Sequence, residues 1–163
     1  MQLTEPLDPL DLKILTELQS DASLHLEALA ERVGSSKSVC WRRIQRFKEE
    51  GIITGSVTLL DPEKVGFGVT VFAFVKIDGR GEVKPAHIIE NIRKIPQVVE
   101  CHAMMGEIDM CLKIVVPTIK DYERLLWEKF SAMPGILDIR SSISLTRFIS
   151  TTQLPLHTLG KKR

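Results

Sequence analysis

Residues 34–51 read GSSKSVCWRRIQRFKEEG, and this stretch decides the fold of the first third of the chain. Gly34 suits the left-handed end of a preceding helix, and Ser35 or Ser36 can cap the start of the next one. The apolar side chains that would face a core recur at helical spacing; they are Val39, Cys40, Ile44 and Phe47. We therefore expect a tight turn followed by a helix that runs to Glu50.

Two further helices are expected before this turn. The apolar residues within Leu10–Leu18 and within Leu26–Val33 are spaced as on one face of a helix. Three short helices, the last two joined by a tight Gly-Ser turn, form the outline of a helix-turn-helix.

The third helix has a distinctive charge pattern. From Arg32 to Lys48 there are six basic residues and no acidic one, although residues 1–55 hold seven Lys and Arg against nine Asp and Glu. A helix of this kind fits the major groove, where arginine pairs with guanine and glutamine with adenine. The residues expected to contact DNA are Ser36, Lys37, Ser38, Trp41, Arg42, Arg43, Gln45, Arg46 and Lys48.

Different roles are expected within this set. Arg42 and Arg43, with Lys37, Ser38 and Gln45, are best placed to reach DNA. Arg46 and Lys48 would contact the DNA backbone. Ser36 and the helix N-terminus would meet a phosphate through backbone N–H groups. Trp41 packs either in the core or at the helix edge beside DNA. The alternative is that the charges are simply solvated on an amphipathic helix.

The remainder of the chain is rich in β-forming segments. Residues 52–60 predict a short strand and connector, with a turn at 61–64. Residues 69–145 then predict strand, helix, strand, strand, helix, strand, which is the ferredoxin-like βαββαβ order. The expected α+β architecture has a helix-turn-helix domain at 1–55, a linker at 56–66 and a ferredoxin-like effector-binding and oligomerisation domain at 67–163. We expect the tail after Leu154 to be frayed.

The expected strands at 69–77 and 110–116 are largely apolar on both faces. Two helices cover only one face of the sheet, so the other face needs a partner. The same face of a second copy is the simplest partner, and we therefore expect a homodimer.

Composition limits the other classes of function. A net charge of +1 excludes a general polycation, and no apolar run reaches the roughly 20 residues of a membrane span. Three unpaired cysteines suit reduced thiols, so we expect a cytoplasmic protein. No phosphate-binding loop, nucleophile elbow or His-x-x-x-His pair is present, and we expect neither an enzyme nor a cofactor. A metal site is a weak alternative, because the spacing of its candidate ligands matches no zinc signature; these are Cys101, His102, Asp109 and Cys111.

The order and spacing of several motifs resemble the Lrp/AsnC (feast/famine) transcriptional regulators over residues 8–156. The motifs are DLKIL at 11–15, LAERVG at 29–34, CWRRI at 40–44, GII at 51–53, LDP at 60–62, GEID at 106–109, PG at 134–135 and TTQLP at 151–155. The resemblance implies an N-terminal winged helix-turn-helix, a linker strand and a C-terminal regulator-of-amino-acid-metabolism domain. It also implies dimers that often assemble into octamers, and effectors that are usually amino acids.

The turn at residues 106–109 is the candidate effector sensor. Gly106 lets a backbone amide approach a ligand carboxylate, and Asp109 could pair with an α-ammonium group. Methionines offer an adaptable apolar wall. The expected effector-binding residues are Met104, Met105, Gly106, Glu107 and Asp109. By the family resemblance this site lies between dimers; the alternative is a plain hairpin turn.

These patterns together predict a sequence-specific DNA-binding regulator whose assembly or DNA affinity responds to a small effector, expected to be an amino acid. A dimer would place two reading helices on an inverted repeat. A ligand-independent architectural DNA-binding protein remains the alternative, since it would share every feature of the first half of the chain.

Overall fold

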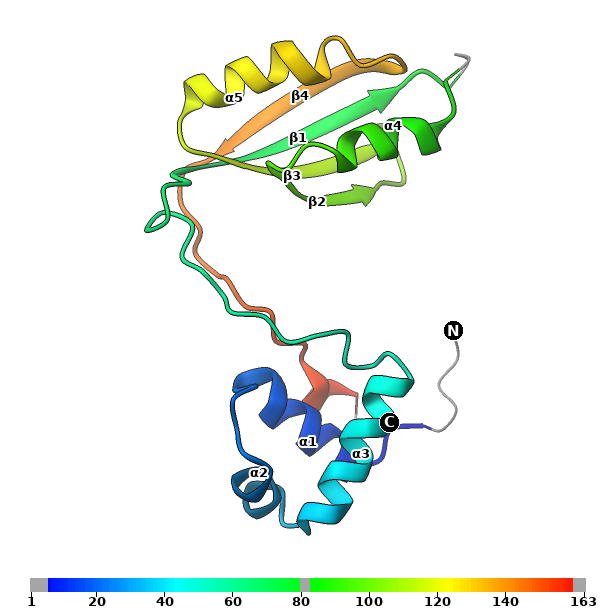
Figure 1. Cartoon of the computed structure of the whole chain (residues 1–163). Helices are drawn as coiled ribbons and strands as arrows, with labels where there is room; N and C mark the ends of the chain where they lie inside the picture. The colour runs from blue at the N-terminus through cyan, green and yellow to red at the C-terminus, as the bar shows by residue number, and fades with distance from the viewer. Residues whose placement is uncertain (1–5, 80–82, 160–163) are drawn as a thin grey trace. The chain divides into compact units, whose positions relative to one another are not determined.

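The computed structural model describes residues 6–79 and 83–159. Its contacts divide into two units. The helical unit consists of Met1–Thr58 together with Ile149–Arg163, and the sheet unit consists of Leu59–Phe148. Figure 1 labels the elements of each unit.

The helical unit contains α1 (Pro9–Ser20), α2 (Leu26–Val33) and α3 (Lys37–Glu49). Local signals fix their ends. Asp8 caps α1, and Pro9 occupies its first turn, where a missing N–H costs nothing. Gly34 ends α2 with φ 68°, and the Ser36 hydroxyl accepts a hydrogen bond from Val39 N–H at the start of α3. The predicted helix-turn-helix is therefore confirmed.

Seven buried residues from the three helices form the core of this unit. They are Ile14, Leu15, Leu29, Ala30, Val33, Cys40 and Phe47. Cys40 and Phe47 lie on one side of α3 and are completely buried. Trp41 is 56 % exposed, so it is not a core residue.

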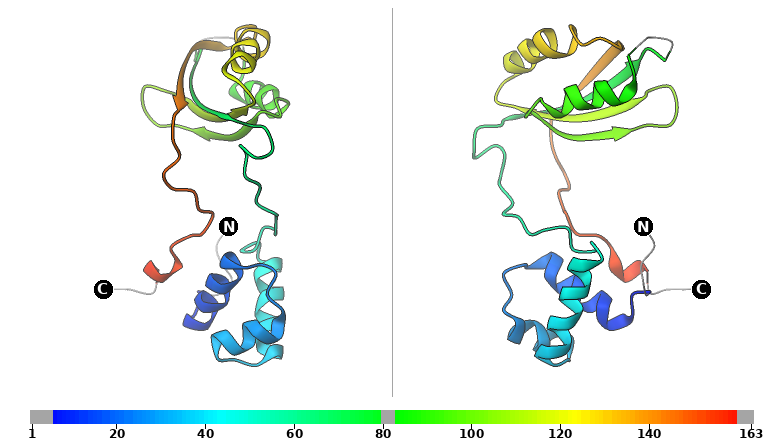
Figure 2. Two further views of the ribbon diagram at one scale, coloured as in Figure 1. Left: turned by 90° about the vertical axis from the view of Figure 1, so that its left-hand side faces the viewer. Right: turned by 45° about the vertical axis from the view of Figure 1, so that its right-hand side comes forward.

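The sheet unit has four antiparallel strands in the order β2-β3-β1-β4. The strands are β1 (Val69–Ile77), β2 (Val98–Ala103), β3 (Met110–Val116) and β4 (Ile136–Ser144). The helices are α4 (Pro85–Arg93) and α5 (Ile119–Leu125), and α5 continues as a π-helical turn at Leu126–Phe130. Both helices lie on one face of the sheet (Figures 1 and 2), which confirms the ferredoxin-like βαββαβ fold.

The two faces of the sheet differ. On the helix-covered face, Val71, Ala73 and Val75 of β1 are completely buried. The opposite face, called the open face here, carries Phe72 and Phe74 in the middle of the sheet. Phe72 is 36 % exposed. At the β2 margin of this face, Lys113 Nζ donates to Glu100 Oε1 at 2.6 Å. The open face is thus apolar in its centre and charged at its edge, rather than apolar throughout.

The strand expected at residues 52–60 does not form. A strand needs a neighbour for its backbone hydrogen bonds, and none of the described residues pairs with this segment. Val57 is 81 % exposed, and Leu59 and Leu60 are each 68 % exposed. The segment is therefore an extended connector with exposed apolar side chains.

The end of the chain also differs from expectation. The expected C-terminal domain ran to residue 163, but the sheet unit ends at Phe148. The Gln19 side chain binds the backbone of Leu154 twice, since Nε2 donates to O at 2.8 Å and Oε1 accepts from N–H at 2.9 Å. Leu156 packs against the helical core and begins a short 3₁₀ turn at Leu156–Thr158. The expected frayed tail is thus anchored to α1 as far as the structure describes it.

Candidate nucleic-acid interface and effector site

The outer face of α3 is formed by Ser38, Arg42 and Gln45, which lie at i, i+4 and i+7 opposite the buried side of the helix. Ser38 and Arg42 are exposed, and Gln45 is half-buried. Ser36 Oγ lies 3.1 Å from Ser38 Oγ at the N-terminal end of this face. Exposed Trp41 lies beside the face, and Lys48 is exposed at the far end of the helix.

The guanidinium groups of Arg43 and Arg46 are held by carboxylates of the first turn of α1, a contact that the sequence did not indicate. Arg43 Nη1 lies 2.6 Å from both Asp8 Oδ2 and Asp11 Oδ1. Arg46 Nη2 lies 2.6 Å from Asp11 Oδ2. We call these four residues the arginine–carboxylate cluster. Successive residues of a helix are about 100° apart, so Arg43 turns toward α1 while its neighbour Arg42 points outward.

The first turn of α1 fixes the carboxylates of this cluster. Asp11 N–H donates to Asp8 Oδ1 at 2.8 Å, and Asp8 N–H donates to Asp11 Oδ2 at 3.0 Å, which is a reciprocal capping box. Asp11 is 1 % exposed, and the two arginines supply the charged partners of this buried side chain. The Asp11 backbone N–H and the Arg43 guanidinium lower the pKa of Asp8. The hydrogen bonds that Arg43 donates to Asp11 and Asp8 raise the pKa of Arg43.

Two other cations near α3 also have acidic partners. Lys37 forms an ion pair with Glu27, and Arg32 Nη1 lies 3.1 Å from Glu17 Oε2. Within the described residues, Arg42 and Lys48 have no ion pair. Acidic residues of α1 and its neighbours thus balance most of the basic segment, which explains why the helical unit is not strongly basic. The cluster was missed because the sequence does not show which face of α1 packs on α3, although the pair Asp8 and Asp11 has the spacing of a capping box.

The candidate effector turn joins β2 to β3 and is tied to the end of β1. Gly106 has φ 136°, a conformation that favours glycine. Asp109 Oδ2 accepts a hydrogen bond from Ile77 N–H at 2.9 Å and lies 3.5 Å from Lys76 Nζ. Lys76 Nζ also donates to the Glu107 carbonyl at 2.6 Å. Lys76 is therefore part of this turn, although its position in the sequence did not indicate it.

The remaining candidate side chains at this turn point into solvent. Met105 is fully exposed, Met104 is 47 % exposed, and Glu107 Oε1 lies 3.8 Å from Arg140 Nη1. The structure thus brings Gly106, Glu107 and Asp109 together with Lys76, whereas the two methionines form no enclosed wall within the described residues.

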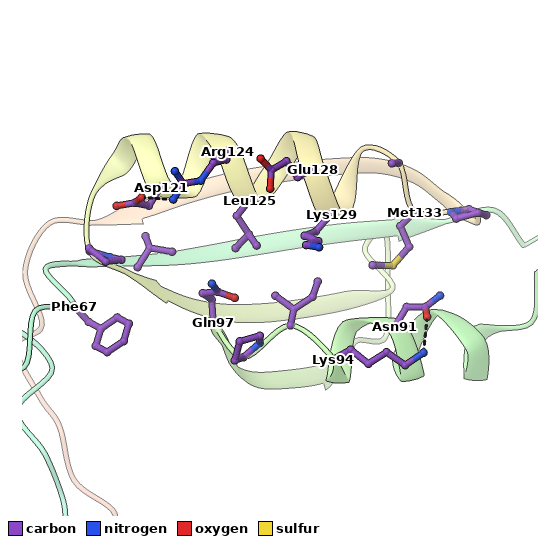
Figure 3. Close-up of a pocket in the computed structure, with 16 residues that line it drawn as sticks. Phe67, Asn91, Lys94, Gln97, Asp121, Arg124, Leu125, Glu128, Lys129 and Met133 are labelled. Atoms are coloured by element: carbon purple, nitrogen blue, oxygen red, sulfur yellow. Dashed lines mark hydrogen bonds and ion pairs between the residues drawn. The ribbon is translucent and has the colours of Figure 1, made fainter.

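A separate groove lies between α4 and α5 in the sheet unit (Figure 3). Its volume is about 750 Å³. The buried side chains Ile95, Val116 and Leu125 are part of its lining, and Lys94 and Lys129 lie on opposite walls. None of the five residues expected to bind an effector lines this groove.

The residues of the alternative metal site share one hairpin, where His102 is the cross-strand partner of Cys111. Cys101 and His102 are neighbours on β2 and point to opposite faces. Among the described residues, no three His, Cys, Asp or Glu side chains are grouped as metal ligands. Burial raises the pKa of the Cys101 thiol, which lowers its thiolate fraction and its reactivity. No described helix has the length and apolar character needed to cross a bilayer.

Family models match both units in chain order. A winged helix-turn-helix DNA-binding model matches residues 7–54, and an Lrp/AsnC ligand-binding domain model matches residues 70–154. This chain belongs to the Lrp/AsnC family of transcriptional regulators. The DNA-binding transcriptional activator DecR of Escherichia coli is 35 % identical to this Lrp/AsnC regulator over 92 % of this chain and 99 % of DecR.

Other relatives agree with this assignment. The glutamate uptake regulatory protein of Zymomonas mobilis is 35 % identical, with 92 % of this chain and 91 % of that protein covered. Among solved structures, an AsnC family regulator from Agrobacterium tumefaciens has a TM-score of 0.88 at 37 % identity, over 94 % of this Lrp/AsnC chain and 99 % of its own. A Neisseria meningitidis transcriptional regulator in complex with L-Met has a TM-score of 0.88 at 33 % identity, with the same coverage. DecR and the two solved structures are named as transcriptional regulators, and the Zymomonas mobilis protein is named as a regulatory protein.

Proposed function

We propose that this Lrp/AsnC regulator binds specific DNA sequences and that an amino acid changes its assembly or its DNA affinity. The observation that carries the DNA-binding part is the exposed outer face of α3, where Arg42 is directed away from the core and has no ion pair among the described residues. We place this activity in the cytoplasm, where such a regulator would meet its DNA.

The chemistry of the outer face suits base recognition. Arg42 can donate two hydrogen bonds to guanine, and Gln45 can pair with adenine. Ser36 and the N-terminus of α3 can hold a phosphate, while Lys37 and Lys48 lie at the two ends of the helix for backbone contacts. Trp41, exposed beside Arg42, can pack against the sugar-phosphate edge. Arg43 and Arg46 are left out of this proposal because carboxylates already hold them.

We infer a homodimer formed through the open face of the sheet. Phe72 and Phe74 give that face an apolar centre, and Glu100, Lys113 and Arg140 give it a charged margin. An apolar centre with a polar rim is the usual anatomy of a protein interface. Two copies would present two α3 helices to an inverted repeat with half-sites about one helical turn apart, or a multiple of it. Further association of dimers into octamers is part of the proposal.

The amino-acid response is supported by the matched ligand-binding domain and by relatives. The Neisseria meningitidis structure is a complex with L-Met, and a feast or famine regulatory protein of Mycobacterium tuberculosis, 27 % identical, is described as complexed with L-methionine. In this chain, the Gly106 backbone suits a ligand carboxylate, and Glu107 or Asp109 suits an α-ammonium group. Because the turn is open in a single chain, a neighbouring copy would have to complete the site.

Thermal melting with each of the twenty amino acids tests this response. A ligand that binds only the folded protein raises the melting temperature, and the stabilisation grows with the logarithm of the ligand concentration divided by Kd. We expect at least one amino acid to raise it and also to change the oligomer size or the affinity for DNA. If no amino acid does either, the ligand-independent architectural function replaces this proposal.

A charge-removing variant locates the site. Asp109→Asn keeps an oxygen that can accept the Ile77 N–H hydrogen bond, so it removes the charge with little loss of structure. We expect this variant to lose the response. Glu123→Gln is the control for charge removal, since Glu123 is an exposed carboxylate of the same unit on α5, away from the turn. An equal response in Asp109→Asn and in the control would move the site elsewhere.

A further inference from the structure

We propose that Asp8 and Asp11 determine the DNA specificity of this chain by holding Arg43 and Arg46 away from DNA phosphates. The inference rests on the proposed DNA binding by α3. It assigns to α1 a role in selectivity, in addition to its part in the core.

The cluster is organised before any DNA is bound. Asp11 is buried, and each of its two oxygens receives one arginine at 2.6 Å. Asp8 gives Arg43 a second partner, and the capping box fixes both carboxylates on the first turn of α1. The side chains of Arg43 and Arg46 are only 21 % and 27 % exposed. If either arginine left, one oxygen of the buried Asp11 carboxylate would lose its charged partner, which is costly.

The cluster reduces the number of cations that α3 can offer to DNA phosphates. Non-specific DNA affinity comes from phosphates neutralised by Lys and Arg, and each such contact steepens the salt dependence of binding. Arg46 lies one turn after Arg42 on α3, and Arg43 is adjacent to Arg42, so released arginines would be close to any DNA on the outer face. While they are held, α3 offers DNA two fewer free cations. Non-specific binding is then weakened more than specific binding, which depends on base contacts.

A purely structural cluster would behave differently. If the ion pairs only fasten α1 to α3, their removal lowers the stability of the helical unit and leaves the salt dependence of DNA binding unchanged. The salt slope on DNA without a preferred site therefore separates the two roles.

The test uses Asp8→Asn in the full chain. The Asp8 side chain is 44 % exposed and asparagine is as good an N-cap as aspartate, so this variant keeps α1 while it removes one carboxylate charge. Asp21→Asn is the matched control, because it makes the same charge change at the other end of α1, where Asp21 binds Ser23. Asp11→Asn is less suitable, since its burial makes misfolding a competing result.

The measurement is fluorescence anisotropy with a scrambled duplex and with a duplex selected by the protein, each over a series of salt concentrations. For Asp8→Asn we expect affinity for the scrambled duplex to rise about 3- to 10-fold and the slope of log K against log salt to steepen by up to about 0.9, the value for one phosphate. The preference for the selected duplex should fall by a similar factor. Asp21→Asn should match the parent.

A double variant assigns the effect to Arg43, which in Asp8→Asn keeps Asp11 as its one carboxylate partner. Arg43→Gln in the Asp8→Asn background should return the slope on scrambled DNA to that of the parent. A slope in Asp8→Asn equal to that of Asp21→Asn overturns the proposal, and so does a slope that stays steep in the double variant. A parent protein that prefers no duplex would refute the proposed sequence-specific function. The salt slopes on scrambled DNA would still test the role of the cluster, so the two failures can be told apart.

Discussion

Adjacent arginines on α3 have opposite surroundings. Arg42 is exposed on the outer face, whereas Arg43 is held by two carboxylates of the first turn of α1. Their difference comes from helix geometry alone, since one residue is a rotation of about 100°. The sequence predicted a basic helix correctly, but it could not separate these two residues because the carboxylates that bind Arg43 are more than thirty positions away.

Single alanine variants should separate the two roles. Arg42→Ala should weaken binding to the preferred duplex by about 1–3 kcal/mol, the range for a bidentate base contact, with an unchanged melting temperature. Arg43→Ala should lower the unfolding free energy by about 2 kcal/mol, as expected for lost charged hydrogen bonds, and keep the preferred site. Fluorescence anisotropy measures the affinity for the duplex, and thermal melting measures the stability of each variant. Loss of site preference in Arg43→Ala alone, with Arg42→Ala unaffected, would reverse the assignment.

Glycine positions in the sheet unit offer a second residue-scale test. Gly135 has φ 89°, and a Cβ there would lie 2.8 Å from Ile88 Cδ1 and 3.1 Å from Val83 Cβ. Gly135→Ala should therefore combine overpacking, about 1–3 kcal/mol, with backbone strain. Gly106→Ala, with φ 136° and no atom within 4 Å of the added Cβ, carries the strain only and is the control. Equal losses of stability in denaturant titrations would show that packing at Gly135 is unimportant.

Elements were predictable where their signals are local. Caps, glycines and apolar spacing lie within or next to α1, α2 and α3, so the sequence alone was sufficient for them. The segment 52–60 has strand-like residues but no strand, because pairing is decided by a partner and not by the segment. The second helix expected within residues 69–145 forms as α5 from Ile119, and it changes to a π turn after Leu125. Packing decides that change of hydrogen-bond register, so spacing could not predict it.

The tail is the element whose position was least accessible from the sequence. It is held by Gln19 and by Leu156, which packs on a core more than 100 residues earlier in the chain. We expect removal of residues 153–163 to lower the melting temperature of the helical unit by about 5–15 °C, since a loss of 1 kcal/mol shifts a small unit by several degrees.

The two tryptophans allow each unit to be observed separately. The chain has two, Trp41 on α3 and Trp127 in the sheet unit. In a Trp127→Phe background, Trp41 fluorescence should show that the truncation lowers the melting temperature of the helical unit. In a Trp41→Phe background, Trp127 fluorescence should show no change in the melting temperature of the sheet unit. Truncation that leaves the Trp41 transition in place would mean that the tail contacts contribute nothing to stability.

At the scale of the whole molecule, one surface is expected to control function through assembly. Phe72→Glu would place a charge in the apolar centre of the open face, so we expect it to convert dimers into monomers in light scattering. The control variant is Ile89→Glu. Ile89 is 39 % exposed, close to the 36 % of Phe72, but lies on α4 and away from the open face. Dimers of unchanged stability in Phe72→Glu would place the interface elsewhere.

Selection of binding sites from a random duplex pool, at one fixed salt concentration near the physiological value, tests the central claim most directly. Affinities depend so strongly on salt that the concentration must be held constant. The account predicts enrichment of an inverted repeat with half-sites spaced by about one helical turn or a multiple of it, and loss of that enrichment in Arg42→Ala. A pool that enriches nothing, or only deformable A/T-rich sequence, would contradict sequence reading by α3.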